Sequence, residues 1–171
     1  MKHSTADSNN SGPEGLLPQK TTFSFIKRPV PVPGDMRIGW RVSALLIVLN
    51  CSRAQRSSLA RLYILNDALI NPGKRELLSD ILIGAAAPRR WRLSIEPALG
   101  RTLDLMAGEK LIEWCRVNDR LGVTLTTRGR ISASVICAEN EILADERLFI
   151  EGVSKQLTEN FTETFIKASS T

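Results

Sequence analysis

The stretch from Leu111 to Arg130 (LIEWCRVNDRLGVTLTTRGR) constrains the fold of this 171-residue chain more than any other segment. Two short strand-like runs flank a polar turn at Asn118 and Asp119, which predicts an antiparallel hairpin. Thr126 or Thr127 then stands as an N-cap before a helix of about residues 128–138. A hairpin that leads directly into a capped helix is typical of the wing of a winged-helix domain. Since winged helices mostly hold nucleic acid or another protein, the question becomes which partner the chain binds.

Apolar residues at helical spacing predict further helices on both sides of this hairpin. The segment from Met36 to Leu49 is apolar almost all round, so we expect it to form the central buried helix. Leu99, Leu103 and Met106 are expected to face the core from the helix just before the hairpin. The predicted helix starts are Met36, Ser57 or Ser58, Asn71 with Pro72 at the first helical position, and Pro97.

Periodicity predicts two further elements. Trp91, Leu93 and Ile95 alternate with polar residues, which predicts a half-buried strand, and a last helix is expected over about residues 143–167. In the second wing strand, Leu121 is expected to point inward with Val123 and Leu125. The predicted fold is therefore mainly α (α+β), a winged-helix-like domain with a small β-wing and a C-terminal helix. The expected boundaries are 1–35 for a disordered N-terminal arm, 36–138 for the winged-helix-like domain and 139–171 for a C-terminal helical extension.

The N-terminal arm is rich in Ser, Asn, Gly and Pro, which disfavours regular structure. Within it, the segment from Thr22 to Ile26 alternates apolar and polar residues, and Phe23 and Phe25 are candidate partner-binding residues. This segment could add an edge strand to a partner or to its own domain, and both alternatives stay open.

Charge points to a polyanion as one partner. The chain has a net charge of +5 and a pI near 9.4, and residues 27–130 hold 18 Lys or Arg against 9 Asp or Glu. Such a surface gains affinity for DNA by releasing the counterions of phosphates. The helix of residues 97–108 carries Arg101 beside Asp104, so we expect contact without sequence reading. The alternative is that the arginines are a solvated face; the candidates are Arg89, Arg90, Arg92, Arg101, Arg116, Arg120, Arg128 and Arg130.

Catalysis and membrane insertion are not expected. The single histidine, His3, lies in the arm, and no phosphate-cradling glycine loop or paired cysteine motif occurs, so we predict no catalytic, cofactor or metal site. The longest apolar run, Ala44 to Leu49, is shorter than a membrane span, and the first residues do not read as a secretory signal. We therefore expect a cytoplasmic protein.

The last helix offers a second kind of partner surface. Its apolar residues recur at spacings of three and four, which suits a homodimer or a docking groove on another subunit. Folding back onto the first helix of the same chain is the alternative, and it stays open. The candidate partner-binding residues on this helix are Ile150, Val153, Leu157, Phe161 and Phe165.

Several segments together resemble a known family. They are Arg37–Arg41 (RIGWR), Leu45–Leu49 (LLIVL), Arg61–Leu69 (RLYILNDAL), Asp104–Glu113 and Thr124–Thr126. In this pattern the chain resembles the middle component of bacterial ABC-three-component systems, the group that includes Lamassu anti-phage defence. The resemblance covers about residues 37–135 and contains no catalytic motif.

The resemblance implies a small winged-helix-like accessory subunit that binds an SMC-like ABC ATPase together with a separate effector. The ATPase of such a system senses foreign or replicating DNA and releases the effector. We therefore expect a non-catalytic adaptor in anti-phage or anti-plasmid defence, with non-specific DNA contact. The alternative is a dimeric winged-helix transcription regulator.

Overall fold

The computed structural model describes residues 34–139 and 141–169. The candidate residues Phe23 and Phe25 of the N-terminal arm lie outside this part of the chain. The described part is mainly helical, with one small antiparallel sheet. Its elements are α1 (Gly34–Asn50), η1 (Arg53–Gln55), β1 (Arg56–Ser58), α2 (Leu59–Ile70), α3 (Pro72–Leu82), η2 (Pro88–Arg90), α4 (Pro97–Gly108), β2 (Ile112–Val117), β3 (Arg120–Leu125), α5 (Thr127–Ala138), α6 (Ala144–Ser154) and α7 (Glu159–Ser169).

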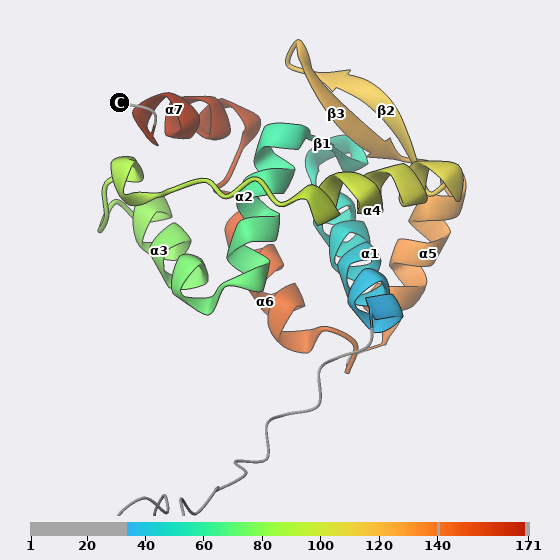
Figure 1. Cartoon of the computed structure of the whole chain (residues 1–171). Coiled ribbons are helices and arrows are strands. Elements are labelled where there is room, and N and C mark those ends of the chain that lie inside the picture. The colour runs from blue at the N-terminus through green and yellow to red at the C-terminus, as the bar shows by residue number, and fades with distance from the viewer. Residues whose placement is uncertain (1–33, 140, 170–171) are drawn as a thin grey trace, which may run out of the picture. The chain divides into compact units, whose positions relative to one another are not determined.

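Helix α1 is the centre of the core. Every residue from Ala44 to Leu49 is buried, which a helix that is apolar all round requires. Figure 1 shows why: α1 and α2 lie in the middle of the described region, with α3 on one side and α5 on the other. The prediction of a central buried helix is confirmed. The core side of α4 is also as predicted, because Leu99, Leu103 and Met106 are buried.

Three helix starts are fixed by the side chains that the sequence indicated. The Ser58 hydroxyl accepts the Arg61 N–H at 3.3 Å, and the Asn71 side chain accepts the Gly73 N–H at 3.1 Å. At α5, the Thr126 hydroxyl accepts a backbone N–H at 3.0 Å. Each cap satisfies a donor that the first helical turn leaves without an internal partner.

The sheet has the strand order β1-β3-β2, with both pairings antiparallel. Val117 pairs with Arg120, so the hairpin closes through the two residues Asn118 and Asp119, whose φ angles are 48° and 60°. Two positive φ angles give a turn whose twist matches that of the strands. The predicted hairpin is confirmed. Leu121 is 57% exposed, however, because it lies near the tip, beyond the part of the hairpin that packs on the core.

Thr126 closes the base of the hairpin. Its backbone N–H donates to the Leu111 carbonyl at 3.1 Å, and its hydroxyl lies 3.2 Å from the same oxygen. Gly129, in the first turn of α5, is buried against this carbonyl. The base of the hairpin and the start of α5 are therefore held together by one carbonyl group.

The predicted strand at residues 91–95 is wrong. The segment has no strand partner among the described residues, since the edge of the sheet beside β3 is occupied by β1, which we did not predict. Trp91 is buried, where its ring meets the Phe165 ring edge-on at 5.7 Å, but Ile95 is 72% exposed. The backbone is held by side chains: Asp67 accepts the Ser94 N–H at 3.2 Å.

The predicted single C-terminal helix is also wrong, because α6 ends at Ser154 and α7 begins at Glu159. The reason is the buried guanidinium of Arg61. Its Nε donates to the Leu157 carbonyl at 2.7 Å and its Nη2 to the Ser154 carbonyl at 3.2 Å. A continuous helix would use both carbonyls for its own hydrogen bonds. Thr158 then caps α7 by accepting the Phe161 N–H at 3.1 Å.

Replacement of Gly129 by Ala should destabilise the protein. The added Cβ would lie 1.9 Å from the Leu111 carbonyl oxygen, so the backbone must move. We expect the free energy of unfolding in urea to fall by about 1–3 kcal/mol, as for other overpacked sites. Gly100→Ala in α4 is the matched control, since its Cβ meets nothing within 4 Å; this variant should gain about 0.5–1 kcal/mol. Equal stability of the two variants would contradict the close approach.

Replacement of Arg61 by Leu tests the role of the buried guanidinium at the break between α6 and α7. The substitution leaves the carbonyls of Ser154 and Leu157 without their donor, and each buried acceptor that loses its partner costs about 1–3 kcal/mol. We expect a loss of at least that size in a urea denaturation experiment. Arg53→Leu is the control, because Arg53 is exposed and its replacement should change stability by no more than about 0.5 kcal/mol.

Candidate functional site

The eight candidate arginines lie on three separate parts of the fold. Those before α4 lie at η2, on the α3 side, whereas α5 lies on the opposite side of the central helices (Figure 1). The eight arginines therefore do not form a single ligand-binding surface. The groups are Arg89 and Arg90 in η2 with Arg92 just after it; Arg101, Arg128 and Arg130 on α4 and α5; and Arg116 and Arg120 on the hairpin.

The α4 and α5 group is offset by acids. Arg128 pairs with Glu109 at 3.6 Å, and Asp104 is exposed on the same helix as Arg101. Mixed charges on α4 leave little net attraction for phosphates. They also leave few side chains of the kind that hydrogen-bond to base edges.

Arg116 and Arg120 of the hairpin belong to a larger set of cations, which lie on three segments of the chain. We call the region formed by these segments the wing end: residues 51–58 around η1, residues 116–121 at the hairpin tip, and residues 154–169, which include α7. The hairpin tip is tied to α7, since the Asn118 side chain donates to that of Asn160 at 3.3 Å and Arg120 pairs with Glu163 at 3.4 Å. The acids in these segments are Asp119, Glu159 and Glu163, and the surface cations are Arg53, Arg56, Arg116, Arg120, Lys155 and Lys167.

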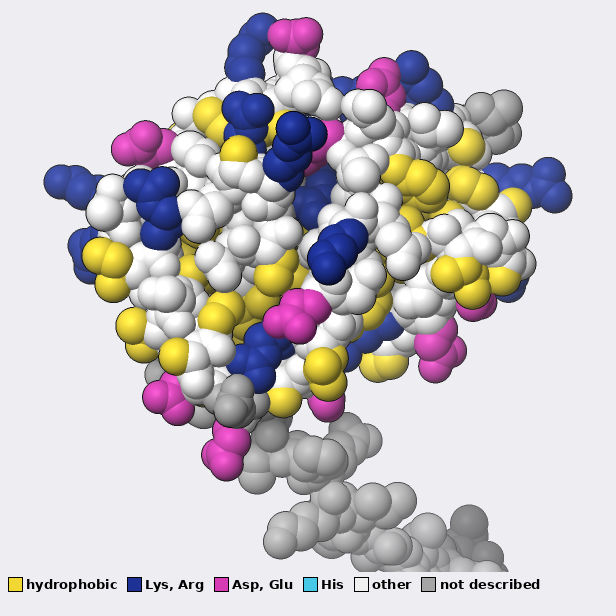
Figure 2. All heavy atoms as spheres, turned by 180° about the vertical axis from the view of Figure 1, so that it is seen from behind, with side chains coloured by type: hydrophobic (Ala, Val, Ile, Leu, Met, Phe, Trp, Pro, Cys, Tyr) yellow, Lys and Arg dark blue, Asp and Glu magenta, His cyan; other side chains and the backbone are white. Residues whose placement is uncertain are grey.

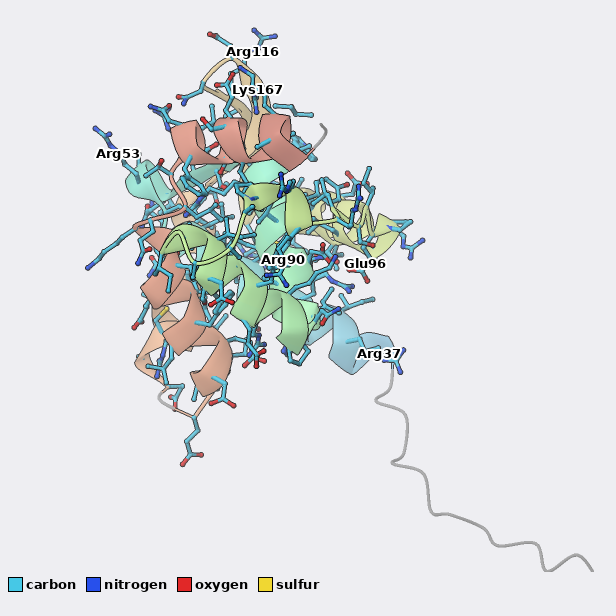
Figure 3. The ribbon with its side chains drawn as sticks, turned by 90° about the vertical axis from the view of Figure 1, so that its left-hand side faces the viewer. Arg37, Arg53, Arg90, Glu96, Arg116 and Lys167 are labelled. Carbon is cyan, nitrogen blue, oxygen red and sulfur yellow. The ribbon has the colours of Figure 1, made fainter. Side chains whose placement is uncertain are left out.

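The figures show where cations gather and place three of those at the wing end. Figure 2 shows Lys and Arg side chains gathered over the upper part of the rear face. In Figure 3, Arg53, Arg116 and Lys167 lie toward the same end of the described region, and Arg37 lies at the opposite end. The wing end is thus the part of the described surface where cations from segments far apart in the sequence come together.

One acid at the wing end is already engaged. The hydrogen bond from Lys167 lowers the pKa of the Glu163 carboxyl, and the charges of Lys167 and Arg120 lower it further. Glu163 therefore stays ionised and offsets part of the positive charge on these two cations. The remaining surface cations, Arg53, Arg56, Arg116 and Lys155, make no salt bridge within the described ranges.

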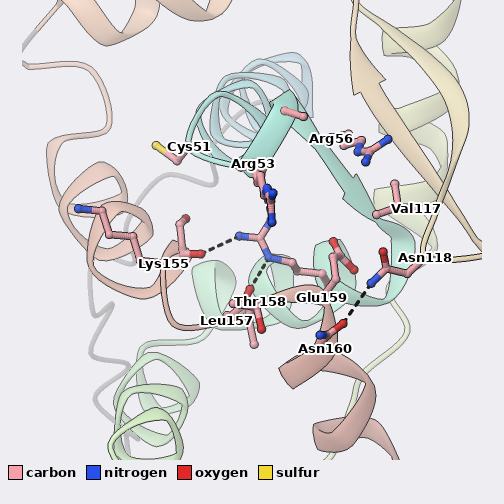
Figure 4. Close-up of a pocket in the computed structure, with 14 residues that line it drawn as sticks. Cys51, Arg53, Arg56, Val117, Asn118, Lys155, Leu157, Thr158, Glu159 and Asn160 are labelled. Carbon is pink, nitrogen blue, oxygen red and sulfur yellow. Dashed lines mark hydrogen bonds between the residues drawn. The ribbon is translucent and has the colours of Figure 1, made fainter.

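A cavity of about 790 Å³ opens at the wing end (Figure 4). Its walls come from three segments: the loop around η1, the hairpin tip and the link between α6 and α7. Arg53, Arg56, Arg61 and Lys155 line it, with Glu159 as its acidic residue. The sequence-based prediction did not include any of these four cations.

A sequence signal for part of this set existed. Arg53 and Arg56 flank a short polar break between two apolar helical segments, which is typical of a surface loop. The burial of Arg61 had no such signal, since an arginine on an amphipathic helix is normally assigned to the solvent face. Two of its partners, the carbonyls of Ser154 and Leu157, lie more than 90 residues away in the sequence.

The candidate partner-binding stripe of the C-terminal segment lies in the core of the chain itself. Ile150, Val153, Leu157 and Phe165 are buried, and Phe161 packs against them. These side chains are therefore occupied by packing within the chain. Helix α6 contacts α1, as the alternative expected, whereas α7 packs against η2 and α2. Exposed apolar side chains occur on several elements, among them Leu148 of α6 (69% exposed) and, on α5, Ile131 (61%) and Val135 (60%).

Other kinds of site were sought in the same part of the chain. Among residues 34–139 and 141–169 no group of three or more His, Cys, Asp or Glu side chains is arranged to hold a metal ion. No helix in these ranges has the length and apolar character needed to cross a membrane. Comparison with protein-family models, curated proteins and solved structures finds no match to the chain.

Proposed function

We propose that residues 36–138 form a winged-helix domain. Two features support this. The chain order is helix, short strand, further helices and then the hairpin, and β1 pairs with β3 so that the hairpin extends from a sheet. Helix α4, which leads directly into β2, stands where such a domain places its reading helix, and α3 is an additional helix between α2 and α4.

The domain binds the phosphates of nucleic acid without reading sequence. The observation that carries this proposal is the charge of the wing end, which contains six surface cations and three acids. Cations that replace the counterions of phosphates add affinity that does not depend on base identity. The mixed charges of α4 argue against sequence readout, and so against a transcription regulator.

The chain acts as a non-catalytic accessory subunit of a cytoplasmic SMC-like ABC ATPase complex, with a separate effector, in anti-phage or anti-plasmid defence. The support for this part is the resemblance over residues 37–135 together with the surface of α5. Ile131 and Val135 are one helical turn apart and exposed, so they share one face of α5. Exposed apolar side chains on one face suit a protein partner.

Replacement of the two hairpin arginines tests the nucleic-acid part. The double variant Arg116→Ala/Arg120→Ala should bind every duplex sequence more weakly than the parent protein. The slope of log K against log salt should fall by about 0.9 for each phosphate that the variant no longer neutralises, measured by fluorescence anisotropy. Arg37→Ala is the control, because Arg37 is exposed at the opposite end (Figure 3). Weaker binding to one sequence only, or an equal reduction in the control, would exclude the wing end as a phosphate surface.

Recovery of partners tests the adaptor part. After nuclease treatment and a high-salt wash, the tagged protein should retain a large coiled-coil ATPase, identified by mass spectrometry. Ile131→Asp/Val135→Asp should reduce this recovery, since a charge on an apolar contact opposes binding. Ile83→Asp is the control because Ile83 is equally exposed but lies at the end of α3. Recovery of the chain alone, as a dimer, would favour a regulator instead.

A further inference from the structure

We propose that the cavity at the wing end binds the phosphate group of a phosphomonoester. The cavity has a volume of about 790 Å³, which falls within the usual range of about 300–1,000 Å³ for small-molecule sites. The inference deepens the proposed function and rests on it in one respect: both assign phosphate binding to Arg53, Arg56 and Lys155.

The first support is charge. Arg53, Arg56, Arg61 and Lys155 line the cavity, and Glu159 is the acid on its lining. Figure 4 shows the Lys155 ammonium pointing away from Arg53 and Arg56, toward the outside. The Glu159 carboxylate also accepts the Ser58 N–H at 3.0 Å. Four cations against one carboxylate leave the cavity with a net positive charge. An anion is therefore the ligand that its field favours.

The second support is the buried guanidinium. Arg61 is 4% exposed and makes no ion pair with any carboxylate in the described ranges. Its donors reach neutral oxygens: the hydroxyls of Ser52 and Ser57 and the carbonyls of Ser154 and Leu157. A buried guanidinium without a direct ion-pair partner is unfavourable, and an anion in the cavity would supply one.

The electrostatics of Arg61 agree with this assignment. Burial lowers the pKa of its guanidinium, and Glu159 opposes that shift through its charge. Nη2 carries two hydrogens and makes one hydrogen bond within the described residues, to the Ser154 carbonyl. One N–H thus remains for a ligand oxygen. The buried hydroxyl of Ser154, a residue that also lines the cavity, has no hydrogen-bond partner among the residues that the structure describes.

The loop around η1 holds its two arginines in a strained backbone. Ala54 and Gln55 have φ angles of 54° and 52°, which residues other than glycine rarely adopt. Such conformations persist where the surrounding structure imposes them, and they concentrate at ligand sites. Here the sharp turn lies between Arg53 and Arg56, so both side chains line the same cavity.

The net positive charge of the cavity favours a terminal phosphate over one within a continuous strand, because a phosphodiester carries only one negative charge. A phosphomonoester has one substituent and carries up to two negative charges. No aromatic side chain is among the described residues that line the cavity, so stacking on a base does not contribute. Free phosphate, a nucleotide and the phosphorylated end of a strand share the required chemistry.

Isothermal titration in phosphate-free buffer tests the inference with two probes. The first is inorganic phosphate, and the second is one oligonucleotide with a 5′-phosphate or a 5′-hydroxyl. We expect saturable phosphate binding by the full chain. Arg53→Ala/Lys155→Ala, two exposed positions, should weaken it by about tenfold or more, as expected when charge-assisted hydrogen bonds are removed. Glu159→Gln removes the opposing charge but keeps an acceptor for the Ser58 N–H, and should tighten binding.

The controls separate the sources and the two proposals. Arg37→Ala should bind phosphate as the parent does. Tighter binding of the 5′-phosphorylated strand identifies a strand end as the ligand, and equal binding of both strands with retained phosphate binding identifies a small phosphate compound. No saturable phosphate binding, or equal affinity in Arg53→Ala/Lys155→Ala, overturns the inference even if duplex DNA still binds. Phosphate binding without salt-dependent duplex binding overturns the proposed function alone.

Discussion

The guanidinium of Arg61 joins the start of α2 to the link between α6 and α7. It links the start of α2 to the carbonyls of Ser154 and Leu157, which end α6 and turn the chain into α7. That turn brings Leu157 and Phe165 into the core and Lys155 to the surface beside η1. Without this interaction the C-terminal segment has the sequence pattern of one long helix, and the cavity would lose one of its three walls. A single buried cation thus organises both the packing and the electrostatics of this region.

Local signals predicted the elements that local chemistry determines. Ser58, Asn71 and Thr126 cap helices because each satisfies a backbone donor a few residues away, and the hairpin turn is set by its two polar residues. Failures arose where a distant residue competes with the local pattern. The three residues of β1 form a strand only because β3 offers them an edge, and the alternation at residues 91–95 produced no strand because no edge was left for it within the described sheet.

The candidate site shows the same division. Sequence reasoning selected Arg116 and Arg120 for their place on the hairpin, and both lie at the wing end. It did not select Arg53 or Lys155, because the loop around η1 and the α6–α7 link are about 100 residues apart and meet only in the folded chain. The count of charges along the chain therefore identified residues 27–130 as basic. It did not show that the arginines of this region lie on three separate surfaces, or that one of these surfaces also contains cations of the C-terminal segment.

The closure at Thr126 has a mechanical consequence. The Leu111 carbonyl accepts a hydrogen bond from Thr126 and packs against Gly129, so the base of the hairpin and the first turn of α5 share one contact point. Helix α5 in turn packs along the central helix α1. A shift of the hairpin base would therefore displace the first turn of α5 and, through α5, act on the central helix.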